Sequence, residues 1–205
     1  MIKGIIFDLG NVLIDFDHRI AARRISRFTD KRDEDIYNLF FDSGLTALFE
    51  EGKITPQGFF LEVKKMLGLA IDYEAFLPIW NEIFFISDKN KAVYNLAKDL
   101  MSHYAVALLS NINRLHFEYL KNRYAIFDAF RYIVTSYEAG CRKPDPQIYT
   151  MTLRLLGITA QECFYTDDRP GLVEGALKLG INAFVFSSAE KLKENLLEAG
   201  VGVYA

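Results

Sequence analysis

The sequence has little cysteine, no long apolar run and no long block of like charge, and each absence excludes a class of protein. Its 205 residues include two cysteines, Cys141 and Cys163, which is too few for a disulfide framework. No CxxC or His-rich spacing indicates a zinc site. No stretch approaches about 18 uninterrupted apolar residues, so we expect no membrane span. The apolar stretch near Met1 ends early, at an aspartate, unlike a signal peptide. We expect a cytoplasmic protein.

The charge balance gives no reason to propose nucleic acid or an anionic membrane as a partner. The net charge is -3 at pH 7, and the basic pairs are short enough to be solvated helix faces. Half of the residues (51%) are hydrophobic, which is ample material for a buried core. The length allows one domain of ordinary size or a core with an insert.

The first strand and the turn after it organise the rest of the chain. The run from Ile2 to Phe7 is short and rich in β-branched residues, which is typical of a strand. Asp8 follows at the point where the chain leaves the sheet, and Gly10 and Asn11 are turn formers. Ligands of open α/β sheets bind outside the carboxyl ends of the strands, so Asp8 is a candidate functional residue.

Between residues 17 and 87 the pattern predicts helices only. One helix is expected over 18–28, and a second begins near Asp33. Thr55 and Pro56 open a third, which Gly68 ends, and a fourth covers 73–83 with an interruption at Pro78. The aromatic side chains of this stretch are expected to form its core: Phe40, Phe41, Phe49, Phe59, Phe60, Trp80, Phe84 and Phe85.

From residue 88 onward, helices and strands alternate, which predicts right-handed βαβ units and a parallel sheet. We expect strands at 104–109, 131–135, 163–165 and 183–186, and helices at 89–100, from Asn113, and at 146–156, 171–179 and 189–199. The predicted fold class is α/β, a doubly wound Rossmann-like core of residues 1–16 and 88–205. Residues 17–87 form the helical insert.

Polar residues follow the early strands where each one ends. Besides Asp8, these are Ser110 with Asn111, and Asp167 with Asp168; the loop after the strand at 131–135 carries Lys143 and Pro144. Each has an ordinary alternative, because Ser, Asn and Asp cap helices and a single lysine is usually a surface residue. Two or three carboxylates that converge repel each other unless a cation lies there, and hard oxygen ligands suit Mg²⁺. A lysine and a hydroxyl beside that cation complete a site for a phosphoryl group, which an aspartate can attack.

Four motifs resemble those of the haloacid dehalogenase-like hydrolases, a superfamily that consists mostly of Mg²⁺-dependent phosphatases. In the order of that family they are Phe7-Asp8-Leu9-Gly10-Asn11-Val12, Leu108-Leu109-Ser110-Asn111, Arg142-Lys143-Pro144 and Tyr165-Thr166-Asp167-Asp168. The insert lies where the family has its helical cap. The resemblance therefore implies a phosphatase that acts on a small phosphorylated metabolite, with Mg²⁺ as cofactor and a cap at 17–87. We expect a monomer or a weak homodimer.

The resemblance also implies roles for individual residues. Asp8 is the expected nucleophile and a metal ligand, and Ser110 and the amide of Asn111 are expected to hold the phosphoryl oxygens. Lys143 is expected to bridge nucleophile and phosphate. The carbonyl of Gly10 and the Asp168 carboxylate are expected metal ligands, and Asp167 ligates the metal or orients its waters. The motifs are most similar to those of the subgroup that contains sugar-1-phosphate phosphatases.

Gly10 departs from the family pattern, because most family phosphatases carry an acid–base aspartate at this position. Asp15, Asp17 and His18 are candidates to replace it. For the cap, the turn Asp42-Ser43-Gly44-Leu45, with Phe49 and Glu50, is the segment that we expect to reach the site, although an ordinary loop is the alternative.

Three other functions are compatible with parts of the pattern. A 2-haloacid dehalogenase also lacks the second aspartate, but it needs no metal, and the pair Asp167-Asp168 argues against it. A receiver domain uses similar groups, but in the reverse order along the chain and without an insert. A catalytically degraded family member is compatible with Gly10. Loss of activity on chelation and a screen of phosphorylated metabolites distinguish these functions.

Overall fold

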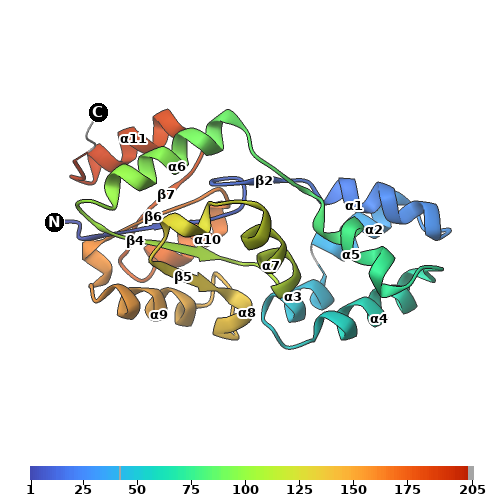
Figure 1. The fold of residues 1–205 in the computed structure, drawn as a ribbon. Helices are drawn as coiled ribbons and strands as arrows, with labels where there is room; N and C mark the ends of the chain where they lie inside the picture. Colours follow the sequence, from blue (N-terminus) through green and yellow to red (C-terminus); the bar gives the residue numbers. More distant parts are fainter. Residues whose placement is uncertain (42, 203–205) are drawn as a thin grey trace.

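The computed structural model describes residues 1–41 and 43–202 and shows a sheet with flanking helices beside a separate group of helices. In Figure 1 the sheet lies on the left and the group of helices on the right, and the strands run toward that group. We call residues 17–87 the helical segment and the remainder the sheet core. None of the helices in the described residues is long and apolar enough to cross a membrane.

The sheet has five strands, and its pairings are all parallel. In spatial order they are β5 (Tyr132–Thr135), β4 (Ala105–Ser110), β1 (Gly4–Phe7), β6 (Cys163–Asp167) and β7 (Asn182–Val185). Phe7 at the end of β1 is in register with Leu108 of β4 and Thr166 of β6. The residues that follow these positions therefore meet at one edge. The α/β fold with a parallel sheet is confirmed.

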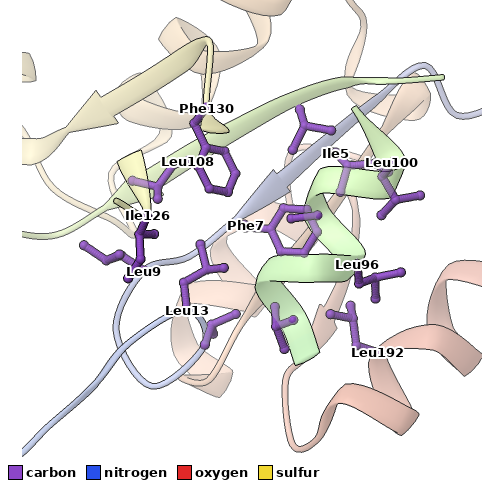
Figure 2. Packing of buried hydrophobic residues seen from close by; sticks show 14 of the residues in the cluster. Ile5, Phe7, Leu9, Leu13, Leu96, Leu100, Leu108, Ile126, Phe130 and Leu192 are labelled. Atoms are coloured by element: carbon purple, nitrogen blue, oxygen red, sulfur yellow. The ribbon is translucent and has the colours of Figure 1, made fainter. Parts of the chain in front are cut away.

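Helices cover both faces of the sheet. Alternate residues of the central strand point to opposite sides, so apolar side chains on each face pack against helices. Ile5 and Phe7 pack with α6 (Asp88–Leu100), α7 (Arg114–Arg123) and α11 (Ala189–Glu198), as Figure 2 shows in part. Ile6 packs on the other face with α9 (Pro146–Leu156) and α10 (Pro170–Leu177). The core also has a short helix that was not predicted, α8 (Ser136–Ala139), and two 3₁₀ turns, Phe127–Ala129 and Ala160–Glu162.

The helical segment has its own hydrophobic core. Its helices are α1 (His18–Ile25), α2 (Asp33–Phe41), α3 (Gly44–Glu50), α4 (Pro56–Leu67) and α5 (Tyr73–Asn81), with a 3₁₀ turn at Ser26–Phe28. Trp80 is fully buried, and Phe49 stacks on Phe59 with ring centroids 4.3 Å apart. Helix α4 starts and stops as predicted, because the Thr55 side chain caps it and Gly68 ends it at φ 65°.

The prediction that residues 17–87 contain only helices is wrong at their end. Phe84–Phe85 (β3) pairs antiparallel with Asp15–Phe16 (β2). The two strands lie where the chain leaves the sheet core and where it returns. Strands of two residues are too short to show the alternation of apolar and polar side chains that identifies a strand in a sequence.

Asp15 fixes the ribbon formed by the two strands β2 and β3 to the sheet core. Its Oδ1 accepts from Lys89 Nζ at 2.7 Å and from Asn90 Nδ2 at 3.2 Å, and its Oδ2 accepts from the Ser87 hydroxyl at 2.7 Å. Burial raises the pKa of the Asp15 carboxyl, but these hydrogen bonds outweigh burial and leave the pKa below its usual value. Asp15 is therefore an ionised anchor at the start of α6.

Candidate active site

A cavity of about 170 Å³ lies between the carboxyl edge of the sheet and the helical segment. One water needs only about 10–15 Å³ of such space, so the cavity is large enough for a ligand. The lining residues from the sheet core include Asp8, Gly10, Ser110, Asn111, Lys143 and Asp168; those from the helical segment include His18, Phe41, Glu50 and Trp80. The sequence-predicted residues thus meet in one place, except that Asp167 lies behind the lining.

Lys143 is the centre of the charged end of the cavity. Its ammonium donates to Asp8 Oδ1 at 2.7 Å, to Asp167 Oδ2 at 2.6 Å and to the Leu109 carbonyl at 3.0 Å. Burial lowers the pKa of Lys143, but the two carboxylates outweigh it and hold the pKa above its usual value. The lysine therefore stays charged, and all three of its hydrogens are used. It is not the surface lysine of the ordinary alternative.

Asp167 acts within the protein as the partner of Lys143. Its Oδ2 also accepts from the Tyr165 hydroxyl, and its Oδ1 accepts from the Arg169 backbone N–H at 2.9 Å. The side chain is fully buried. Both oxygens are thus engaged by protein donors, which distinguishes Asp167 from its neighbour Asp168.

Asp168 is half-buried and is held by Asn11, a residue that sequence reasoning assigned only to the turn. Asn11 Nδ2 donates to Asp168 Oδ2 at 2.9 Å. Asn11 has φ 55°, in the left-handed region, and its N–H closes a tight turn on the Ile14 carbonyl at 2.7 Å. Asparagine tolerates this conformation better than most residues, which explains why the turn places an amide next to Asp168.

The three carboxylates leave a surplus of negative charge. Oxygens of Asp8, Asp167 and Asp168 lie within 4.8 Å of one another. Burial raises the pKa of Asp8 to about 7 against the opposing effect of Lys143, and burial also raises the pKa of Asp168. One ammonium does not balance three carboxylates, whereas a divalent cation with oxygen ligands would. The donor set therefore fits Mg²⁺.

Ser110 and Asn111 do not cap the helix that follows them, because Asn113 does. The Asn113 side chain accepts from the His116 N–H at 3.0 Å. The side-chain amide of Asn111 instead binds the backbone of Lys143. Its Nδ2 donates to the Lys143 carbonyl at 2.9 Å, and its Oδ1 accepts from the Lys143 N–H at 2.8 Å. Ser110 is buried at the cavity. Ser110 thus remains available to a ligand, and Asn111 fixes the lysine.

A side chain at Gly10 would collide with Phe16. A Cβ built on Gly10 would lie 2.8 Å from Phe16 Cε1. Real Cβ atoms essentially never come so close to another heavy atom, so an aspartate at this position needs Phe16 to move. The aromatic ring thus occupies the space next to the residue that departs from the family pattern.

The candidates to replace an acid–base group at Gly10 differ in position. Asp15 anchors the ribbon, and Asp17 caps α1 by accepting from the Arg19 N–H at 2.8 Å. Neither lines the cavity, but His18 does. Burial lowers the pKa of His18 to about 4 against the effect of Asp17, so the imidazole is neutral at pH 7.

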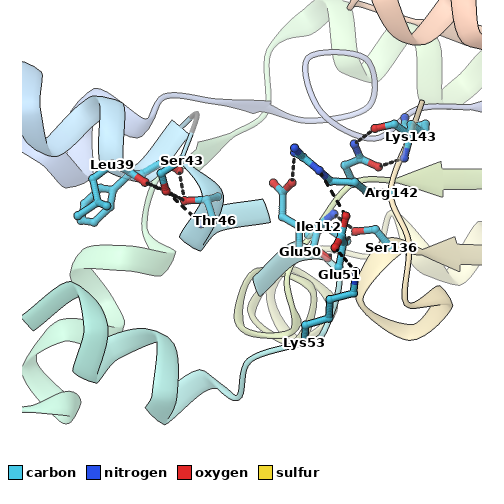
Figure 3. A network of polar contacts seen from close by, with 12 residues as sticks. Leu39, Ser43, Thr46, Glu50, Glu51, Lys53, Ile112, Ser136, Arg142 and Lys143 are labelled. Carbon is cyan, nitrogen blue, oxygen red and sulfur yellow. Dashed lines mark hydrogen bonds and ion pairs between the residues drawn. The ribbon is translucent and has the colours of Figure 1, made fainter. Parts of the chain in front are cut away.

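The segment after α2 meets the sheet core through Glu50 rather than through Phe49. Figure 3 shows Arg142 reaching Glu50 and Glu51, with nitrogen–oxygen distances of 3.3 Å and 3.8 Å. Glu50 lines the cavity, and burial raises the pKa of its carboxyl. Phe49 is 1% exposed in the core of the helical segment and is not among the residues that line the cavity.

The expected turn at 42–45 also needs correction. Asp42 lies outside the described residues. Ser43 caps α3 by accepting from the Thr46 N–H at 3.1 Å, and Gly44 and Leu45 belong to the helix. Leu45 packs against the core of the helical segment. Of the other aromatic residues that we expected in that core, Phe84 packs against it and also lines the cavity, whereas Phe41 lines the cavity and Phe85 is exposed.

Comparison with known proteins identifies the family. The model of the haloacid dehalogenase-like hydrolases matches residues 2–180. The chain belongs to this family. It is therefore a hydrolase, as the four motifs indicated.

Relatives of known structure or name support the assignment. A D-ribitol-5-phosphate phosphatase of Bacteroides thetaiotaomicron is 25% identical over 190 residues, covering 90% of this chain and 91% of the relative. A sesquiterpene phosphatase of Aspergillus oryzae is 26% identical and covers 87% of each chain. A family enzyme of Bacteroides thetaiotaomicron, solved with magnesium and inorganic phosphate, is 28% identical with a TM-score of 0.79, covering 92% of this chain and 96% of the other. Phosphatases of small phosphorylated compounds are thus among its relatives.

Proposed function

We propose that the protein is a Mg²⁺-dependent phosphatase that hydrolyses a small phosphorylated metabolite, a sugar phosphate, through an aspartyl-phosphate at Asp8. The observation that carries the proposal is the contact of Lys143 with both Asp8 and Asp167 beside Asp168, at the edge where β1, β4 and β6 end. This arrangement combines a fixed nucleophile, a fixed cation and a carboxylate cluster for a metal. Family relatives named as phosphatases support it.

Each residue at the charged end of the cavity has a separate role in this reaction. Lys143 holds Asp8 Oδ1, which leaves Oδ2 without a protein donor among the described residues and free to attack phosphorus. The bond from phosphorus to the substrate's ester oxygen then breaks, and that oxygen takes up a proton from water and leaves as an alcohol. Water then attacks the phosphorus of the aspartyl-phosphate, which releases phosphate and restores the carboxylate. Ser110 and the backbone N–H of Asn111 would hold the phosphoryl oxygens.

Asp8, Asp168 and the Gly10 carbonyl would hold Mg²⁺. Asp167 would act through Lys143 and through the waters of the metal, because its own oxygens already accept protein hydrogen bonds. The metal supplies positive charge where the phosphoryl group develops negative charge. We propose that residues 17–87 act as the cap over residues 1–16 and 88–205. Cytoplasmic location and a monomer or weak homodimer stay predictions.

The substrate class rests on weaker support than the reaction. The motifs are most similar to those of sugar-1-phosphate phosphatases, and one relative is named for the phosphate of a five-carbon polyol. In addition, Glu50 and Arg142 bring charged hydrogen-bonding groups to the cavity wall. Such groups suit hydroxyl-bearing substrates.

The proposal is tested by phosphatase assays with Mg²⁺ and with EDTA on a panel of phosphorylated metabolites. We expect chelation to abolish activity, and Asp168→Asn to raise the Mg²⁺ requirement and lower activity about 100-fold or more. Asp99→Asn is the matched control, because Asp99 is an exposed carboxylate of α6 outside the cavity. Rapid acid quench with a ³²P-labelled ester should trap phosphate on Asp8. Metal-independent release of halide from a 2-haloacid would favour the dehalogenase instead.

A further inference from the structure

Two buried nitrogen atoms at the cavity have no hydrogen-bond partner among the described residues. They are His18 Nδ1 and Trp80 Nε1, and both residues line the cavity. Buried polar atoms are nearly always hydrogen-bonded, so each unpaired atom requires an explanation. Both belong to the helical segment, His18 to α1 and Trp80 to α5, whereas Lys143 belongs to the sheet core.

Aromatic rings surround these atoms. Six rings line this part of the cavity, and we call them together the aromatic end: Phe16, His18, Phe41, Trp80, Phe84 and His116. The His18 ring is centred 5.3 Å from Phe16, 5.8 Å from Phe41 and 5.9 Å from Trp80. The aromatic end therefore offers flat apolar faces with two polar atoms among them.

His116 shows what a histidine with only a structural role looks like in this place. Its Nδ1 lies 3.0 Å from Asn113 Nδ2, and its Nε2 lies 3.0 Å from the Trp80 carbonyl. Since Nδ1 faces an amide donor and Nε2 faces a carbonyl, the ring carries its hydrogen on Nε2. Both nitrogens are satisfied by the protein. His18 packs edge-on or tilted against the same rings, yet no described residue supplies a partner for its Nδ1.

We propose that the aromatic end binds the ring of a cyclic, hydroxyl-bearing substrate, and that one ring hydroxyl bridges Trp80 Nε1 and His18 Nδ1. This inference rests on the function proposed above, for which it names the substrate class. The indole N–H is a donor only, so its partner must be an acceptor. A neutral imidazole among aromatic rings does not favour an anion. A hydroxyl satisfies both, since it accepts and donates.

The geometry of the rings favours a cyclic substrate over an open chain. The centroids of His18 and Trp80 are 5.9 Å apart, so the two rings are close enough for one small group to contact both. The C–H face of a sugar ring can pack on the flat aromatic faces, as apolar groups do. An acyclic polyol must give up the freedom of several bonds to take the same place.

Two matched substrate pairs test the ring preference. Each pair has the same number of carbons and the same type of phosphate ester: ribose 5-phosphate with ribitol 5-phosphate, and glucose 6-phosphate with glucitol 6-phosphate. We expect the cyclic member of at least one pair to have a kcat/KM about tenfold higher. Equal kcat/KM values within both pairs, or a preference for the open chains, would overturn the proposal.

Three substitutions at His18 test the hydrogen bond. His18→Phe keeps the ring and removes the nitrogen, so kcat/KM for the cyclic substrate should fall about tenfold, mainly through KM. His18→Asn places an amide near the position of Nδ1 and should recover most of the loss, whereas His18→Gln, which mimics Nε2, should not. Acetyl phosphate has no ring and reports any effect of His18 on the chemistry itself. If its hydrolysis fell as much as that of the cyclic substrate, His18 would act in proton transfer and the binding role would be overturned. A His18→Phe enzyme equal to wild type would show that water serves this nitrogen.

Binding can be followed without catalysis, because Trp80 is the single tryptophan of the chain. In Asp8→Asn protein with Mg²⁺, ribose 5-phosphate should shift the fluorescence of Trp80, and inorganic phosphate should not. If this variant binds the sugar phosphate but the wild type hydrolyses none, the proposed function fails and the subsite stands. If the wild type hydrolyses acetyl phosphate but no sugar phosphate shifts Trp80, the function stands and the subsite fails.

Discussion

The two ends of the cavity differ in how completely the protein satisfies its own polar atoms. At the charged end, the Lys143 ammonium uses all three hydrogens, and both Asp167 oxygens are bonded. At the aromatic end, His18 Nδ1 and Trp80 Nε1 have no partner in the part of the chain that the structure describes. A fully bonded network is rigid and suits a reaction that needs fixed charges. Unpaired atoms are positions that a ligand can fill, so the difference indicates chemistry at one end and selection at the other.

The largest effect should come from breaking the charged end alone. Asp8→Asn removes the nucleophile, and we expect kcat to fall at least about 10⁴-fold. Because the aromatic end is built from other residues, sugar phosphate binding measured by Trp80 fluorescence should change much less. Steady-state kinetics and fluorescence titration on the same preparation check this. A loss of binding as large as the loss of turnover would show that the two ends are not separate.

Next in size is the effect of Phe49→Ala on the stability of the helical segment. Phe49 is fully buried and stacked on Phe59, so the cavity left behind should cost about 3–5 kcal/mol. Hydrogen exchange should rise in peptides from α3, α4 and α5 and stay low in peptides from β1 and β4. Activity should fall alike on all substrates. A changed ranking of substrates without lost stability would return Phe49 to the specificity role predicted from the sequence.

The position of Phe16 predicts a double substitution with a gain of function. Gly10→Asp alone should not increase turnover, because its Cβ meets the Phe16 ring. Gly10→Asp with Phe16→Ala opens the space, and turnover of poor leaving groups should rise by up to about 100-fold if the aspartate serves as acid and base. Phe16→Ala alone is the control. An equal gain from the single Gly10→Asp would show that Phe16 is no obstacle.

The smallest expected effect concerns acid stability at the aromatic end. Burial lowers the pKa of His116 to about 3, from an ordinary value of 6.5. Between these pH values the unfolded chain binds a proton that the folded protein does not, so stability falls as pH falls. His116 alone should change the free energy of unfolding by about 1.4 kcal/mol per pH unit in this range. Above about pH 6.5 its stabilising contribution is complete.

Urea unfolding between pH 4 and pH 7 measures that slope. The substitution His116→Phe removes the titrating group. The unfolding free energy of this variant should therefore depend less on pH, and the difference in slope should correspond to at most one bound proton. The comparison with wild type cancels the carboxylates that titrate in the same range. Identical slopes in the two proteins would mean that His116 is protonated in the fold.

The charged end could be predicted from the sequence for a geometric reason. Parallel strands bring their carboxyl ends to one edge, so Asp8, Ser110 and Asp168 must meet there once the strands are recognised. The partners that hold them were not predictable in the same way. Asn11 and Tyr165 were attributed to a turn and a strand, because nothing in their local spacing shows which carboxylate they contact.

The aromatic end could be predicted only in composition. The richness in aromatic residues correctly indicated a packed helical core, but helical spacing does not separate a ring that faces this core from one at the cavity. Phe49 was expected both in this core and near the cavity, and only the core position is correct, whereas Phe41, expected in the core, lines the cavity. The ribbon was missed because two-residue strands have no period.

The antiparallel pair of β2 (Asp15–Phe16) and β3 (Phe84–Phe85) holds the two ends of the helical segment together. Asp15 pairs with Phe85 and Phe16 with Phe84, so the exit from the sheet core and the return to it lie on adjacent strands, roughly 5 Å apart. A segment whose ends meet can be exchanged for another, or shortened to a tight turn, without displacing strand β1, which precedes Asp8, or the loop that carries Lys143. Grafting a different bundle between these two strands is thus a route to new substrates that leaves the hydrolytic end intact.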